Sequence, residues 1–118
     1  MRITQQQFDS LGNLPKETFA RRSTEFLRHR FPEAANSPLD EVLAAVRIAV
    51  QRGEIHGLRA EQDLAAYVLT SFLLGSDFDT EFPAAYDVLF SPVLEPSDKA
   101  LWLTQWTEEM FLTLAGGY

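Results

Sequence analysis

The sequence of 118 residues contains no cysteine, which excludes disulfide bonds, thiolate metal ligands and a cysteine nucleophile. Small secreted domains often depend on disulfides for stability, so their absence favours the cytoplasm. The N-terminus lacks the apolar core of a signal peptide, and no apolar run approaches the roughly 20 residues that cross a bilayer. We therefore expect a cytoplasmic protein without a membrane-spanning segment.

Histidine is also scarce, and the six glycines are scattered along the chain. His29 and His56 belong to separate segments and no HExxH pattern occurs, so the sequence offers no recognisable zinc site. Carboxylates alternate over residues 77–81 as in the first half of an EF-hand loop, but Phe82 stands where that loop requires glycine. There is no glycine-rich phosphate loop and no GxSxG motif. We expect no metal and no other cofactor, and we predict that the protein is not an enzyme.

Basic residues are outnumbered by acidic ones, and the formal net charge is −7. Residues 1–35 carry a formal charge of +2, whereas residues 77–118 carry −7. Because phosphate binding depends on lysine and arginine, this balance argues against a nucleic-acid-binding protein. Two interpretations of the acidic part stay open: a solvated surface that favours solubility, and an acidic face that binds a basic partner.

The longest apolar run covers residues 64–74 and is interrupted only by Thr70 and Ser71. A helix that is apolar on every side is expected to be buried on every side. Gly75 follows the run and is the kind of residue that ends a helix. We therefore predict a buried central helix at about residues 61–74, within a single domain that covers residues 1–118.

Local start and stop signals divide the rest of the chain into further helices. Thr4 and Gln7 fit a capping box, so a short helix is predicted over residues 5–11, ended by Gly12 and a turn at Pro15. Apolar positions three and four residues apart, together with prolines and glycines, predict the other helices: 16–30, 37–53 with Ser37 as its cap, 83–90 and 95–114. Residues 33–36 and 76–82 are expected to be connections. The predicted fold is all-α, a single compact bundle of four substantial and two short helices.

Acidic and aromatic side chains cluster late in the chain. Aromatic residues anchor protein interfaces, although at helical spacing they also form cores. Without a catalytic motif, surface recognition is the function that the residues favour. The predicted partner-binding residues are Asp79, Glu81, Tyr86, Asp87 and Trp102.

Three short motifs occur between residues 56 and 79: His56-Gly57-Leu58, Glu61-Gln62-Asp63-Leu64 and Gly75-Ser76-Asp77-Phe78-Asp79. Together with the ITQQQFDSLG start and a basic segment that ends in HRFP, they resemble a family of small bacterial proteins encoded beside type VI secretion effectors and their adaptors. The resemblance covers most of residues 1–90. Ala60 departs from it, because a serine or threonine helix cap is expected there.

The resemblance implies a non-enzymatic accessory protein, a co-adaptor or chaperone-like factor that binds a secretion effector or its adaptor. An immunity protein that masks the active site of a cognate toxin is the alternative, and an acidic face suits the basic groove of a nuclease. A structural or regulatory subunit unrelated to secretion, or an enzyme without a recognisable motif, is the third possibility. The oligomeric state stays open. Within the family segment, Phe78 is expected to pack against the central helix, and Asp77 and Asp79 to cap and turn the chain.

Overall fold

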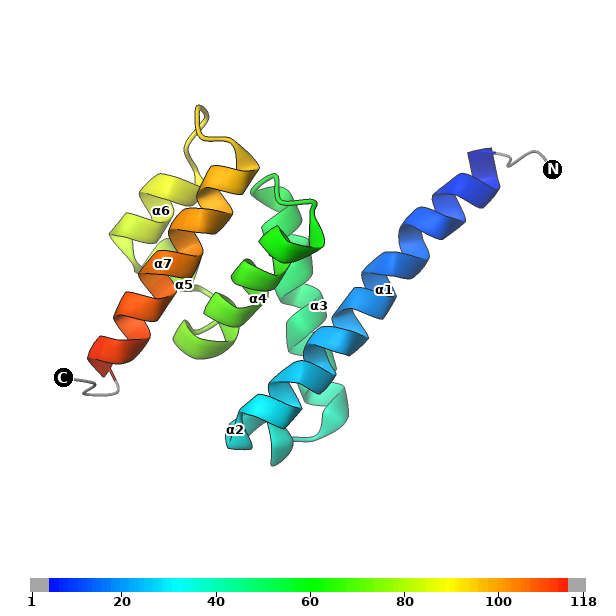
Figure 1. Cartoon of the computed structure of the whole chain (residues 1–118), viewed down its shortest axis with the longest axis horizontal. Coiled ribbons are helices and arrows are strands. Elements are labelled where there is room, and N and C mark those ends of the chain that lie inside the picture. Colours follow the sequence, from blue (N-terminus) through cyan, green and yellow to red (C-terminus); the bar gives the residue numbers. More distant parts are fainter. Residues whose placement is uncertain (1–4, 115–118) are drawn as a thin grey trace. The chain divides into compact units, whose positions relative to one another are not determined.

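The computed structural model describes the backbone of residues 5–114 and the side chains of residues 16–113. Helices are the regular elements of this range, and no strand forms within it, so the all-α prediction is confirmed (Figure 1). The helices are α1 (Gln5–Arg30), α2 (Pro32–Ala35), α3 (Leu39–Ile55), α4 (Glu61–Leu74), α5 (Phe78–Glu81), α6 (Pro83–Leu89) and α7 (Pro96–Leu114). The chain divides into two compact units, residues 1–46 and 47–118, and α3 contributes to both. Over the described residues, no helix combines the length and the apolar content that crossing a bilayer requires.

In the first unit, α1 runs without a break through Gly12 and Pro15, so the predicted short helix and turn are wrong. Proline removes one backbone donor from a helix, but its fixed φ is itself helical. Glycine in a helix costs about 1 kcal/mol relative to alanine, which does not force an end. The predicted end of the helix at the Phe31–Pro32 step is confirmed, because Phe31 is extended at φ −126° and ψ 122°.

A short helix, α2, replaces the predicted connection at residues 33–36. Pro32 takes its first position, where a missing N–H costs nothing, and Ala34 is buried. The Arg28 guanidinium donates to the carbonyl of Ser37 over 3.1 Å and so ties the end of α1 to the chain after α2. Such a one-turn helix was not predicted because a helix this short is not stable by itself and depends on its packing.

The start of α3 also differs from the prediction. The N–H of Val42 donates to the carbonyl of Pro38, which places Pro38, and not Ser37, at the cap position. The hydroxyl of Ser37 donates to the carbonyl of Glu33 over 2.7 Å, in the preceding turn.

In the second unit, α4 begins and ends where the apolar run predicted, and Gly75 follows it with φ +103°. Its burial is one-sided, since Leu64, Tyr67 and Val68 are buried whereas its other apolar residues are half-buried or exposed. The helix packs mainly against α7. Thr70 of α4 and Thr107 of α7 share a buried hydrogen bond between their hydroxyls.

Aromatic rings form much of the core of the second unit. Phe78 is fully buried, and its ring centroid lies 4.9 Å from that of Tyr67 on α4, as the sequence predicted. Trp106 of α7 lies against Phe78 at 6.4 Å and against Phe82 at 5.3 Å, and it stacks on Trp102 at 5.1 Å. Because Phe78 belongs to this core, the predicted connection over residues 76–82 instead contains the short helix α5.

Gly53 was predicted to end the third helix, but α3 continues to Ile55. A Cβ atom on Gly53 would lie 2.9 Å from Cδ2 of Leu64 and 3.4 Å from Cγ of Tyr67. Gly53 therefore allows the last turns of α3 to approach α4 closely, and its role is in packing.

The end of α3 is a Schellman motif built from the His56-Gly57-Leu58 sequence. The N–H of Gly57 donates to the carbonyl of Glu54, and the N–H of Leu58 donates to that of Gly53. Gly57 has φ +92°, in the region that favours glycine, and Leu58 is fully buried. This motif fixes the position of His56 at the helix end.

Candidate functional site

A buried hydrogen-bond network joins the end of α3 to α4 and α5. Nε2 of His56 lies 2.9 Å from Oδ2 of Asp79, and the hydroxyl of Tyr67 donates to the same oxygen over 3.1 Å. All three residues are buried. The aspartates were expected to cap and turn the chain, which is wrong for Asp79, because its carboxylate points into this network.

An ionised carboxylate that is buried needs hydrogen bonds or an opposite charge to offset its lost hydration. Asp79 has both, since Nη1 of Arg52 lies 4.0 Å from its Oδ1. Burial, followed by the negative charge of Asp79, raises the pKa of Tyr67 well above its usual value near 10. The phenol therefore keeps its proton and remains a hydrogen-bond donor.

At the edge of the network, Arg52 also pairs with Asp77, with Nη1 2.8 Å from Oδ1, and donates to the carbonyl of Ser76. The hydrogen bond with Asp77 is the main reason that the pKa of Arg52 is raised, against an opposing effect of burial. The side chains are 36% and 58% exposed, so this pair contributes at most about 1 kcal/mol. Asp77 occupies the N-cap position of α5, as predicted, but its side chain makes no capping bond and accepts from Arg52 instead.

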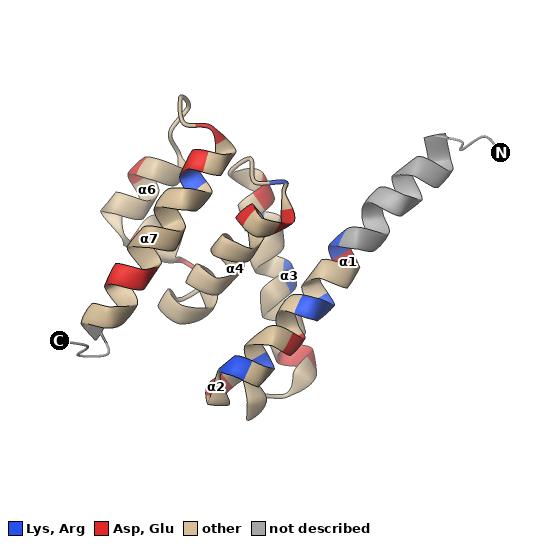
Figure 2. Cartoon of the chain, viewed as in Figure 1, with Lys and Arg blue, Asp and Glu red and all other residues tan. Residues whose placement is uncertain are grey.

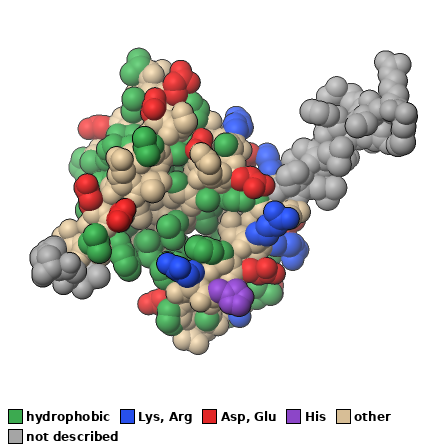
Figure 3. Space-filling model, in the orientation of Figure 1, with side chains coloured by type: hydrophobic (Ala, Val, Ile, Leu, Met, Phe, Trp, Pro, Cys, Tyr) green, Lys and Arg blue, Asp and Glu red, His purple; other side chains and the backbone are tan. Residues whose placement is uncertain are grey.

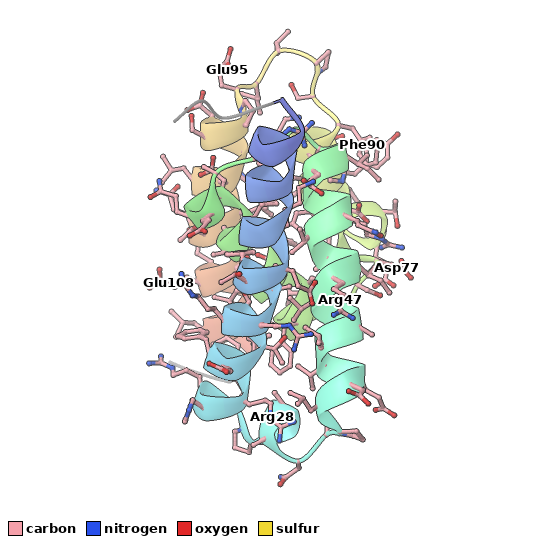
Figure 4. All side chains as sticks on the ribbon, turned by 90° about the vertical axis from the view of Figure 1, so that its right-hand side faces the viewer. Arg28, Arg47, Asp77, Phe90, Glu95 and Glu108 are labelled. Carbon is pink, nitrogen blue, oxygen red and sulfur yellow. The ribbon has the colours of Figure 1, made fainter. Side chains whose placement is uncertain are left out.

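Arg52, His56, Asp77 and Asp79 contribute to the lining of an open pocket of about 240 Å³ in the second unit. The large apolar residues of the lining are Ile55, which is 78% exposed, and Phe90, which is 47% exposed. The Phe90 ring meets His56 edge-on at 4.8 Å and Tyr86 at 4.5 Å. Figure 4 shows Asp77 and Phe90 on the same side of α3. The lining residues are Arg52, Ile55, His56, Asp77, Asp79, Thr80 and Phe90.

A buried lysine holds the backbone next to this pocket. Nζ of Lys99 donates to the carbonyl of His56 over 3.2 Å and to that of Leu89 over 2.8 Å. These carbonyls lie at the C-terminal ends of α3 and α6, where the helix dipole favours a cation. Lys99 therefore brings the two helix ends together and, with them, His56 and the neighbouring Phe90.

The five predicted partner-binding residues occupy different environments. Asp79 is buried in the network, whereas Glu81 is exposed on α5. Tyr86 and Asp87 are exposed neighbours on α6, and Trp102 is half-buried on α7. The structure thus places Tyr86 and Asp87 together, and Asp79 within the pocket wall. Their role in partner binding stays a prediction.

Of the seven residues that line the pocket, the predicted partner-binding set included only Asp79. The six that it did not include are Arg52, Ile55, His56, Asp77, Thr80 and Phe90. Arg52 and Ile55 are the last turn of α3 before His56-Gly57-Leu58, and a Schellman end can be inferred from that glycine and the leucine after it. No comparable local signal places Phe90, because its position depends on the bond between Lys99 and Leu89.

The pocket offers a ligand hydrogen-bonding groups, the exposed Arg52–Asp77 ion pair and the apolar side chains of Ile55 and Phe90. Within the part of the chain whose side chains are described, no three histidine or carboxylate side chains are grouped to hold a metal ion. A scan against protein-family models, a search of curated proteins and a search of solved structures found no match to the chain. The functional argument therefore depends on this site and on the short motifs.

Proposed function

We propose that this chain is a protein-binding accessory factor, co-adaptor or chaperone-like, for a type VI secretion effector or its adaptor in the cytoplasm. The partner contacts the pocket and the adjoining exposed side of α6. We call this surface the pocket–α6 face and define it by Ile55, Asp77, Tyr86, Asp87 and Phe90.

The observation that carries the proposal is the aromatic pair on this face. Tyr86 and Phe90 are each 47% exposed and contact each other beside the pocket. Aromatic residues are enriched in interfaces, and hot spots form where such anchors stand beside a pocket. Complete burial of an exposed side chain of this size contributes about 1.5–3 kcal/mol, and because these two are already about half-buried, covering each of them contributes roughly half of that.

A histidine–aspartate hydrogen bond can orient a general base, but the burial of His56, Asp79 and Tyr67 favours a structural role for this network over catalysis. A general base must reach a substrate proton, and a nucleophile needs an activating base. Here His56 is hydrogen-bonded to Asp79, Asp79 accepts from Tyr67 as well, and Arg52 pairs with Asp77. These bonds hold the fold together and give each group a structural partner.

One observation favours an immunity protein as the second candidate. Residues 47–118 hold eleven acidic and four basic residues, so this unit carries the entire net charge of −7. Figure 2 shows acidic residues on α4, α6 and α7. Such a unit suits a toxin with a basic substrate groove.

Co-purification tests the proposal. The full chain, carrying an affinity tag, is co-expressed with the effector and with the adaptor encoded beside it. The wild type is expected to retain one of them, and Tyr86→Ser/Phe90→Ser is expected to lose it. The matched control is Leu101→Ser/Leu112→Ser on α7, where two apolar side chains are 58% and 48% exposed. Retention of neither protein, or equal retention by all three chains, would contradict the proposal.

A toxicity assay separates the two candidates. An immunity protein binds the isolated toxin domain and protects cells that express it. An accessory factor leaves those cells unprotected and retains the complete effector or its adaptor. Protection that is lost in Tyr86→Ser/Phe90→Ser would establish the immunity role at the same face.

A further inference from the structure

We infer that the pocket–α6 face takes a cationic segment of the partner, with an arginine or lysine side chain at the pocket mouth between Asp77 and the Tyr86–Phe90 pair. This inference rests on the proposed function, because it specifies the chemistry of the partner at the same face. It follows from three features of the described residues: the local charge, the available acceptors and the aromatic rings.

Exposed carboxylates lie in the pocket lining and on the helices α5 and α6 that contribute to this face. Asp77 lines the pocket with a side chain that is 58% exposed, Asp87 is exposed beside Tyr86, and Glu81 is exposed on α5. Arg52 is the basic residue that lines the pocket, and its Nη1 is already bonded to Asp77 and to the carbonyl of Ser76. The local excess of negative charge attracts a cation and repels an acidic segment.

The Asp77 carboxylate can accept a second cation. A carboxylate offers about four acceptor positions, and the bond with Arg52 uses one of its oxygens. An arginine of the partner can form paired charge-assisted hydrogen bonds with such a group. The pair already present on this face thus shows how a guanidinium is held there.

The aromatic pair offers the second half of the recognition. A lysine or arginine cation is attracted to an aromatic ring when it lies within about 6 Å of the ring centre. The same side chains carry long apolar stems that pack on exposed apolar residues such as Ile55. On the face shown in Figure 3, where α7 lies in front, hydrophobic side chains are interspersed with acidic ones.

Peptide binding to the full chain tests the inference. The probes are three fluorescein-labelled helical peptides of about 14 residues, near the shortest length at which isolated helices persist. They share their leucines and carry arginine, glutamine or glutamate at the remaining exposed positions. Fluorescence anisotropy is expected to show that the arginine peptide binds at least about tenfold more tightly than the glutamine peptide, with a clear loss at higher salt.

Variants locate the effect. Asp77→Asn/Asp87→Asn is expected to weaken the arginine peptide about fivefold or more and to leave the glutamine peptide nearly unchanged. The control is Asp98→Asn/Glu108→Gln, which removes two exposed charges from α7. Circular dichroism verifies that each variant keeps its helices.

The outcomes separate this inference from the proposed function. If the arginine and glutamine peptides bind equally and Tyr86→Ser/Phe90→Ser weakens both, the cationic inference is overturned and the face stands. If the aromatic variant binds every peptide as the wild type does, or if no peptide binds, the inference fails together with its surface. Sedimentation of the chain alone that shows a dimer, dissociated by Asp77→Asn/Asp87→Asn, would assign the face to a second copy and would also overturn it.

Discussion

Removing the Asp79 carboxylate is the sharpest test of the second unit, because this one group joins three helices. Its Oδ2 accepts hydrogen bonds from His56 and Tyr67, and its Oδ1 lies 4.0 Å from Nη1 of Arg52. Asp79→Ala deletes the acceptor and leaves buried donors without it. Asp79→Asn keeps the shape and one oxygen, and it removes the negative charge.

The contacts of each carboxylate predict the order in which the variants lose unfolding free energy. Asp79→Ala leaves the buried donors of His56 and Tyr67 without an acceptor, and each such group costs about 1–3 kcal/mol, so we expect a loss of unfolding free energy of about 2–6 kcal/mol. A hydrogen bond to a charged group contributes about 1 kcal/mol more than one to a neutral group, and two such bonds give about 2 kcal/mol for Asp79→Asn. The control Asp77→Asn breaks a pair that is largely exposed and should cost at most about 1 kcal/mol.

Urea unfolding followed by tryptophan fluorescence measures these differences. The two tryptophans, Trp102 and Trp106, lie on α7, so their emission reports on the unit that contains Asp79. The slope of free energy against urea should stay constant across the variants. An Asp79→Ala chain that is as stable as Asp77→Asn would refute the argument that the buried network stabilises this unit.

Three further predictions use the same measurement. Gly57→Ala places a Cβ atom on a residue with φ +92° and should destabilise the second unit by about 1–2 kcal/mol; no change would mean that the left-handed conformation is not required. Lys99→Met leaves the carbonyls of His56 and Leu89 without their donor and should cost about 2–4 kcal/mol, whereas equal stability would show that the buried ammonium contributes nothing. The raised pKa of Tyr67 means that the folded state keeps a proton that the unfolded state releases, so stability is complete below pH about 10 and falls by about 1.4 kcal/mol per pH unit above it. Tyr67→Phe should remove that part of the alkaline loss, and an identical slope in both chains would contradict the protonated donor.

Elements whose signals are local were predicted well from the sequence. The end of α4 was predicted from Gly75, which follows an apolar run, and the starts of α6 and α7 from the prolines at their first positions. These signals do not depend on contacts with the rest of the chain. Errors arose where packing decides. A glycine often follows the last turn of a helix, but Gly53 lies inside α3. Its lack of a side chain there allows Leu64 to approach closely.

The site depended on pairings that a single sequence does not display. His56 and Asp79 are 23 residues apart, and neither is part of a sequence motif with a known catalytic or metal-binding spacing. The acceptors of Lys99 are backbone carbonyls, which every residue has, so no side-chain pattern reveals them. An exposed position was expected for Asp79 as a partner contact, because acidic residues are seldom buried unless paired.

Two of the three short motifs on which the family resemblance rests meet in space, and this bears on what they indicate. His56-Gly57-Leu58 ends α3, and Gly75-Ser76-Asp77-Phe78-Asp79 ends α4, supplies the core residue Phe78 and returns Asp79 to His56. His56, Gly57, Leu58, Phe78 and Asp79 of these motifs therefore each have a structural role. Chains that share both motifs are expected to share the network and the pocket wall, while differing in what they bind. Under the proposed function, the choice of partner then depends on the exposed residues Tyr86, Asp87 and Phe90 outside the motifs, together with the exposed Asp77 within one of them. Substitutions at these positions should change binding while leaving the unfolding free energy nearly unchanged.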